Sequence, residues 1–140
     1  MILTGLDRYR DIGLLLLRAG LGMMMVTHGG PKIMGGPEMW EKVGGAMGNF
    51  GINFAPVFWG FMAAAAEFGG GIALAFGFLF RPACAMLLST MMVAATHHLR
   101  AGDGLGGASH AIELGVVFLA LILIGPGRFA ADERFARGNK

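Results

Sequence analysis

Long apolar runs separated by short polar stretches dominate the pattern of this chain. Four runs stand out, at about 12–28, 56–80, 82–98 and 108–124. A helix needs about 20 mostly apolar residues to cross ~30 Å of hydrocarbon, and each run comes near that length. The runs lack the period-2 alternation of strands and are rich in Ala, Leu and Met, which favour helix. The pattern predicts an all-α protein, a four-helix transmembrane bundle.

The connection between the first two runs, residues 29–55, carries a pattern of its own. Pro37 can open a short helix. One face of that helix would then carry Met39, Trp40, Val43 and Met47. We expect a short amphipathic helix that lies in the membrane interface or caps the bundle. An ordinary loop with exposed aromatic side chains is the alternative.

The remaining connections are short and contain residues that end helices. Phe80-Arg81-Pro82 predicts a tight turn between the second and third runs, because proline suits the first turn of a helix. Gly125-Pro126-Gly127 stops the last helix, because proline cannot continue it. We therefore expect a single membrane domain over residues 1–140.

Composition supports a membrane protein. Hydrophobic residues make up 55% of the chain and charged residues only 14%, with a mean hydropathy of +0.63. Soluble domains carry about 25% charged residues. Basic residues sit at run ends and tails rather than along one stripe, which argues against nucleic-acid binding. Cys84 is the only cysteine, so an intrachain disulfide and cysteine-based metal sites are excluded. Arg18 interrupts the first run, which favours a retained span over a signal peptide.

The distribution of Lys and Arg predicts the orientation of the bundle. With four spans, both termini lie on one side of the membrane. The other side holds three basic residues, Lys32, Lys42 and Arg100. The terminal side holds seven, namely Arg8, Arg10, Arg81, Arg128, Arg134, Arg137 and Lys140. The positive-inside rule therefore places both termini in the cytoplasm.

Ionisable residues inside the predicted spans are the candidates for function. All four histidines, His28, His97, His98 and His110, fall near the non-cytoplasmic face. Arg18 lies roughly 15 Å below His28 at 1.5 Å per residue, and Glu67 lies roughly 16 Å below Pro56. An unpaired charge at that depth costs at least ~2.5–3.5 kcal/mol. We therefore expect an ion pair between Arg18 and Glu67.

A second carboxylate extends this cluster. Glu113 follows His110 at i,i+3 spacing, which places both on one helix face. We expect Arg18, Glu67, Glu113 and His110 to form a polar cluster, with His28, His97 or His98 near its mouth. Two interpretations stay open. The cluster is either a ligand pocket or a structural lock between helices.

Methionines beside the histidines raise the question of a metal. Met23 to Met25 precede His28, and Met91 and Met92 precede His97. Thioether and imidazole ligands suit copper. Methionine is also an ordinary filler of apolar cores, and these methionines point around their helices rather than at one spot. A single His–Glu pair is a weak metal signal as well, and we predict no metal site.

Several short motifs, taken together in order and spacing, resemble the DoxX family of small bacterial membrane proteins. They are Arg18-Ala19-Gly20, His28-Gly29-Gly30-Pro31-Lys32, Glu67 with Gly70-Gly71, Gly77, Arg81-Pro82, His97, Glu113, Gly125-Pro126-Gly127-Arg128 and Asp132. The resemblance implies a four-helix bundle in the bacterial cytoplasmic membrane. It also implies a relation to the small subunit of thiosulfate:quinone oxidoreductase and an association with sulfur redox chemistry. The family's polar positions correspond to Arg18, His28, Lys32, Glu67, Arg81, His97 and Glu113.

The leading functional hypothesis is a redox-associated subunit that binds a quinone or a small sulfur compound. In this hypothesis Glu67, Glu113 and Arg18 are the catalytic candidates. The ligand-binding candidates are His28, Lys32, His97 and His110. The sequence shows no redox centre, so electrons would come from a partner protein or from the substrate. Two rivals remain, a non-enzymatic membrane scaffold or assembly partner and a small proton-coupled carrier that acts as an oligomer. Under each hypothesis we expect the protein to form a homo- or hetero-oligomer.

Overall fold

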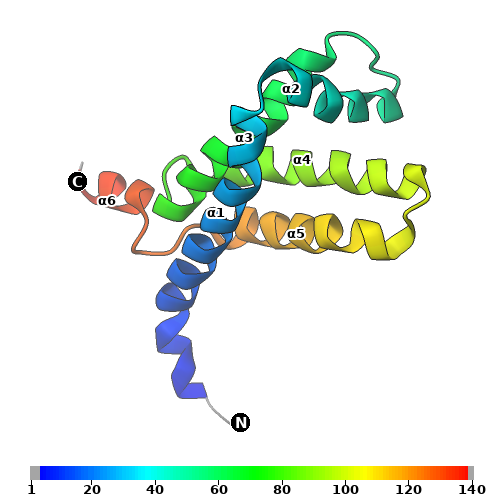
Figure 1. Ribbon diagram of the computed structural model, residues 1–140. Coiled ribbons are helices and arrows are strands. Elements are labelled where there is room, and N and C mark those ends of the chain that lie inside the picture. The colour runs from blue at the N-terminus through cyan, green and yellow to red at the C-terminus, as the bar shows by residue number, and fades with distance from the viewer. Residues whose placement is uncertain (1–3, 139–140) are drawn as a thin grey trace.

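The computed structural model describes residues 4–138 and is helical almost throughout (Figure 1). Residues 4–138 contain six α-helices and two 3-10 helices, and no strand, which confirms the all-α prediction. In chain order they are η1 (Thr4–Tyr9), α1 (Arg10–Met34), α2 (Gly36–Gly44), η2 (Gly45–Phe50), α3 (Pro56–Phe76), α4 (Phe80–Ala101), α5 (Gly104–Ile124) and α6 (Ala131–Gly138). Lys140, counted above in the charge balance, lies outside the described residues.

Helices α1 and α3 form a closely packed antiparallel pair. Glycine makes their approach possible, because a Cβ atom on Gly22 would lie 2.5 Å from the carbonyl oxygen of Gly71. A Cβ atom on Gly29 would collide with the backbone of Phe68. Small residues at such crossings let membrane helices pack backbone against backbone. The pair is therefore held in one register along its length.

Helix α1 extends further than the sequence pattern predicts. The first span was expected to end near His28, but α1 continues to Met34 with Pro31 inside it. The contact of Gly29 with α3 keeps this stretch helical, although the proline removes one backbone donor. As a result Lys32 lies on a helix, one turn beyond Gly29 on the face that packs against α3.

The turn between α3 and α4 also differs from the expected one. Helix α3 ends at Phe76 rather than near residue 80, and Gly77 adopts a left-handed conformation with φ +67°. Helix α4 already begins at Phe80, so Phe80-Arg81-Pro82 forms its first turn and not the connection. The carboxylate of Asp132 makes this early start possible, because it accepts hydrogen bonds from the backbone N–H of Leu79 and of Phe80, both at 2.9 Å.

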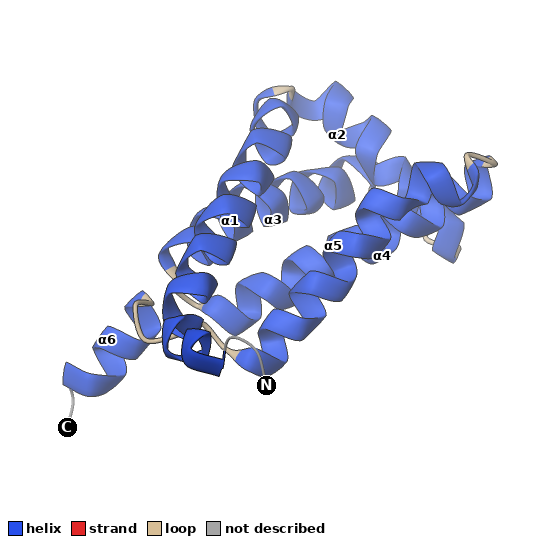
Figure 2. Cartoon of the chain, turned by 90° about the horizontal axis from the view of Figure 1, so that it is seen from below, coloured by secondary structure: helices blue, strands red, loops and turns tan. Residues whose placement is uncertain are grey.

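The segment 125–132, here called the C-terminal clasp, ties the start of α1 to the α3–α4 turn. The N–H of Arg128 donates to Asp11 Oδ1 at 3.0 Å. Arg18 Nη2 donates to the carbonyl of Phe129 at 2.8 Å, and the N–H of Asp132 donates to the carbonyl of Gly77 at 3.0 Å. One end of the molecule therefore holds the clasp. At the other end the α1–α3 and α4–α5 pairs diverge (Figures 1 and 2).

The surface of the bundle is strongly apolar. Large side chains such as Leu16, Leu105 and Leu123 are 68%, 72% and 76% exposed. Three helical stretches, Gly5–Met34, Pro56–Phe76 and Gly104–Ile124, are long and apolar enough to cross a membrane. Helix α4 is as long but more polar, because its last turns carry histidines and an arginine. Exposed apolar area on this scale is expected where lipid is the solvent.

Candidate functional site

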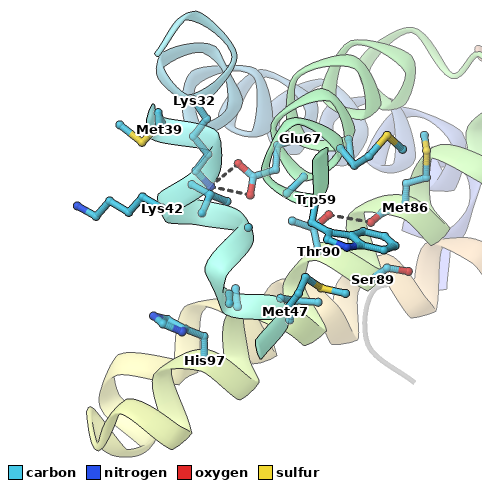
Figure 3. Close-up of a pocket in the computed structure, with 18 of the residues that line it drawn as sticks. Lys32, Met39, Lys42, Met47, Trp59, Glu67, Met86, Ser89, Thr90 and His97 are labelled. Atoms are coloured by element: carbon cyan, nitrogen blue, oxygen red, sulfur yellow. Dashed lines mark hydrogen bonds and ion pairs between the residues drawn. The ribbon is translucent and has the colours of Figure 1, made fainter. Parts of the chain in front are cut away.

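A cavity of about 520 Å³ lies where the two helix pairs diverge (Figure 3). We call it the α2 cavity, because α2 and η2 form one of its walls while α3 and α4 form the others. Its lining is mostly apolar and includes several methionines. Its lining includes Lys32, Met39, Lys42, Val43, Met47, Trp59, Met62, Ala66, Glu67, Met86, Ser89, Thr90, Ala94, His97 and His98.

An ion pair between Lys32 and Glu67 is the polar centre of this cavity. Lys32 Nζ lies 2.7 Å from Oε1 and 2.6 Å from Oε2 of Glu67, so the ammonium group bridges both carboxylate oxygens. Glu67 is only 3% exposed. About a third of the Lys32 side chain is accessible, at 32%. Figure 3 shows the two side chains pointing toward each other, one from α1 and the other from α3.

Helix α2 fixes the position of Lys32. The indole N–H of Trp40 donates to the carbonyl oxygen of Lys32 at 2.9 Å, beside the backbone N–H of Gly35, which donates to the same oxygen at 3.3 Å. A Cβ atom on Gly60 would collide with the carbonyl group of Trp40, so α2 sits directly on the α3 backbone. The short amphipathic helix predicted from sequence is therefore present. Its face with Met39 and Val43 lines the cavity.

Few hydrogen-bonding groups on the cavity wall are free to face a ligand. The hydroxyls of Ser89 and Thr90 donate to carbonyl oxygens of their own helix. His97 Nδ1 lies 3.2 Å from Asn49 Nδ2, which links α4 to η2 at the rim. The Nε1 atom of Trp59 is buried and has no hydrogen-bond partner among the described residues. The cavity thus combines an apolar wall with one concentrated polar group.

A second cavity, of about 260 Å³, lies on the other side of the ion pair. We call it the histidine cavity, because its lining includes His28, His98 and His110, beside Met25, Met91, Gly107, Ala111 and Leu114. Four residues belong to the linings of both cavities, namely Lys32, Glu67, Ala94 and His98. The Lys32–Glu67 pair therefore borders both an apolar space and a histidine-lined space.

Contacts among the histidines agree with their predicted gathering at one end. The rings of His28 and His110 have centroids 5.8 Å apart, across the gap between α1 and α5. His98 Nδ1 lies 2.7 Å from a carboxylate oxygen of Asp103. Within residues 4–138, no three His, Cys, Asp or Glu side chains lie close enough together to hold a metal ion.

The predicted ion pair between Arg18 and Glu67 is wrong. Arg18 Nη1 donates to the carbonyl of Ala75 at 2.9 Å and Nη2 to that of Phe129, which places Arg18 at the clasp end. The depth estimate failed because it took His28 and Pro56 as equally deep. Since Gly29 packs against Glu67 and Phe68, Glu67 lies level with Gly29, about three helical turns from Arg18, beside which it was expected.

Glu113 lies apart from both cavities as well. Its side chain is exposed on α5, although it follows His110 by one helical turn. Of the predicted cluster, the structure therefore brings together Glu67 and His110, with His28 and His98 around them. Lys32, predicted only as a ligand-binding residue, takes the place of Arg18 beside Glu67.

The sequence reasoning missed much of the α2 cavity wall. Trp59, Met62 and Met86 line it and were not singled out. Helical spacing alone gave no signal, because residues facing lipid and residues facing an apolar cavity look alike. The predicted amphipathic face was a partly usable signal, because Met39 and Val43 on α2 and Met47 on η2 line the cavity, whereas Trp40 does not.

Comparison with known proteins identifies the family of this chain. The family model described as DoxX matches residues 13–99, which is more than half of the chain. The chain belongs to the DoxX family. Inner membrane protein YqjF of Escherichia coli strain K12 is similar to this DoxX protein, at 29% identity over 132 residues. The aligned part covers 91% of this chain and 95% of that relative. No solved structure gives a significant match.

Many of the residues that carry the DoxX resemblance fall into two groups at opposite ends of the molecule, whereas Glu113 is exposed on α5 and belongs to neither. Arg18, Gly77 and Asp132 belong to the contacts of the clasp. Arg81 likewise donates to the carbonyl of Ile122, near the end of α5. Residues of the other group line the cavities, namely His28, Lys32, Glu67 and His97. Only this second group has the geometry of a binding site.

Proposed function

We propose that this DoxX protein is a four-span subunit of the bacterial cytoplasmic membrane that binds a quinone in the α2 cavity. Both termini lie in the cytoplasm, and α4 is the fourth span because it packs between α3 and α5 as a helix of 22 residues. The cavity opens toward the non-cytoplasmic side. The Lys32–Glu67 pair in an otherwise apolar cavity is the observation that carries the proposal.

The size and lining of the cavity support a quinone over a small sulfur compound. Sites for small organic ligands measure about 300–1,000 Å³, are mainly apolar and contain a few placed polar groups. A volume of about 520 Å³ fits that range. Methionine side chains adapt to an aromatic ring and make favourable sulfur–ring contacts. A sulfur oxyanion would leave most of this apolar wall without a contact.

The ion pair supplies the chemistry that a quinone headgroup needs. Lys32 would donate a hydrogen bond to a quinone oxygen and neutralise negative charge that develops there. Glu67 is an acceptor and proton-exchange group beside that oxygen. His97 stands at the rim, and Met39 and Met86 contact the ring. Electrons come from a partner protein, so the chain acts as one part of a redox assembly.

Tryptophan fluorescence tests quinone binding directly. The chain has two tryptophans, of which Trp59 lines the α2 cavity and Trp40 binds the backbone of Lys32. A quinone in the cavity therefore quenches their emission. We expect saturable quenching of the purified protein by a short-chain benzoquinone. Glu67→Gln should weaken binding by about tenfold or more, because it removes a charged hydrogen-bonding group and keeps the side-chain shape.

Glu113→Gln is the matched control, because it makes the same chemical change on the exposed face of α5. Binding by this variant should equal that of the wild type. Equal quinone affinity in the Glu67→Gln and wild-type proteins would remove Glu67 from the site. A fluorescence response to thiosulfate and not to the quinone would instead identify a sulfur compound as the ligand.

A further inference from the structure

The histidine cavity differs from the α2 cavity in what it can hold. Its wall carries five ionisable side chains around about 260 Å³, namely His28, Lys32, Glu67, His98 and His110. A water molecule takes about 30 Å³ of liquid and needs two to four polar partners, so the cavity has room and partners for several waters. The imidazoles of His28 and His110 are exposed, which opens this space to the surface.

The position of Glu67 connects the histidine cavity with the α2 cavity. The carboxylate is 3% exposed, yet it belongs to the linings of both cavities. The ionisable groups that line these two cavities with it are His28 and Lys32 from α1, His97 and His98 from α4 and His110 from α5, with Asp103 behind His98. From α2 only Lys42 reaches the α2 cavity, and Figure 3 shows its side chain directed away from the ion pair.

We propose that the histidine cavity is a water-filled proton path between Glu67 and the aqueous phase beside the α4–α5 connection. An imidazole takes up a proton on one ring nitrogen and releases one from the other, so His28, His98 and His110 carry protons between bulk water and the carboxylate. Each transfer moves one proton from water to imidazole and from imidazole, through water, to Glu67. No electron or co-reactant is required.

This path deepens the proposed function, on which its purpose rests, because it assigns the source of protons at the quinone site. In the proposed orientation protons enter and leave on the non-cytoplasmic side. The α2 cavity then stays apolar for the ligand, while exchange with water takes place behind the ion pair. In this proposal the Lys32–Glu67 pair separates the α2 cavity from the histidine cavity.

Cysteine accessibility tests whether the histidine cavity is wet. Ala111 lines it and is 6% exposed, so Ala111→Cys places a thiol on its wall. The native Cys84 is the control, because it is fully buried and lines neither cavity. We expect a charged thiosulfonate that does not cross membranes to modify Ala111→Cys in sealed vesicles, from the side of the α4–α5 connection. The wild type should stay unmodified. Reaction only with a membrane-permeant maleimide would show a dry cavity and overturn the proposal.

Ala66→Cys separates this test from that of quinone binding, because Ala66 lines the α2 cavity alone. A short-chain benzoquinone with every ring position substituted, so that it does not add readily to thiols, should protect Ala66→Cys from a permeant maleimide when bound and leave Ala111→Cys reactive with the charged reagent. Loss of protection with Ala111→Cys still reactive would refute the quinone site and leave the water path standing. Protection of Ala66→Cys with an unreactive Ala111→Cys would refute the water path and leave the quinone site standing.

Infrared spectroscopy tests the role of the histidines as proton carriers. The carboxyl band of Glu67 is identified by its loss in Glu67→Gln. After a rapid drop in pH, we expect the protonated band to rise at least about tenfold more slowly in the double variant His28→Gln, His110→Gln than in the wild type. An unchanged rate, in a variant that melts at the wild-type temperature, would exclude these two histidines from the path.

Discussion

The two basic residues of α1 that lie within the bundle have different tasks, and their partners decide which. Arg18 is 2% exposed and binds two backbone carbonyls, so it closes the clasp. Lys32 binds a carboxylate at the wall of two cavities. A planar guanidinium suits fixed carbonyl acceptors, whereas a flexible ammonium can shift with a ligand. The residue with catalytic potential is therefore the lysine.

Removing either partner of the ion pair should have unequal effects on stability. Lys32→Met leaves a buried carboxylate without a counter-charge and should lower the free energy of unfolding by about 3 kcal/mol. Glu67→Gln leaves a lysine that still reaches solvent and should lower it by about 1 kcal/mol. Unfolding in mixed detergent micelles measures both values. The double variant Lys32→Met, Glu67→Met should recover most of the loss. Equal losses in the two single variants would contradict the asymmetry of burial.

At the scale of elements, glycines decide how closely α1 approaches α3. Gly22 and Gly20 lie on the same helix with opposite surroundings. A Cβ atom at Gly22 would meet the backbone of α3, whereas at Gly20 it would meet no atom within 4 Å. The same substitution at the two positions therefore separates packing from helix propensity.

Alanine at these two glycines should change stability in opposite directions. Gly22→Ala forces the helices apart and should destabilise by about 1–3 kcal/mol. Gly20→Ala improves helix propensity and should stabilise by up to about 1 kcal/mol. Thermal unfolding in detergent compares the two variants. A Gly22→Ala protein as stable as Gly20→Ala would show that this crossing is looser than described.

The existence of the helices could be predicted from the hydrophobic pattern and the composition, and membership of the DoxX family from short motifs. The pairing of charges was not, because it depends on register between α1 and α3. That register is set by Gly29 against Phe68, a contact between distant parts of the chain. The sequence pattern treats Gly29, Gly30 and Pro31 as a break. Packing against α3 overrides this local preference and carries α1 on to Lys32.

At the scale of the whole molecule, the clasp and the cavities occupy opposite ends. The bonds of Asp11 and Asp132 place the start of α1, the α3–α4 turn and the C-terminal segment together. The α4–α5 connection lies at the end with the histidines. In the proposed orientation, the clasp end faces the cytoplasm and the histidine end faces outward. The basic side chains near the clasp support a cytoplasmic clasp.

Labelling of two engineered thiols should establish this orientation. Leu105 and Phe135 are both exposed, at the start of α5 and on α6 respectively. A maleimide that does not cross membranes should label Leu105→Cys in intact spheroplasts, and Phe135→Cys only after lysis. The reversed labelling pattern would show that the clasp faces away from the cytoplasm and that the proton path opens to the cytoplasm.

The clasp also determines how the molecule can flex. The α4–α5 hairpin is tied to the rest at one extremity, and across the other the contact between Asn49 and His97 is the hydrogen bond that joins it to η2. Any rotation of such a hairpin would be centred on the clasp. A small rotation there would be amplified along the length of α4, so the part of the α2 cavity beside His97 would widen most while the interlocked glycines of α1 and α3 stay still.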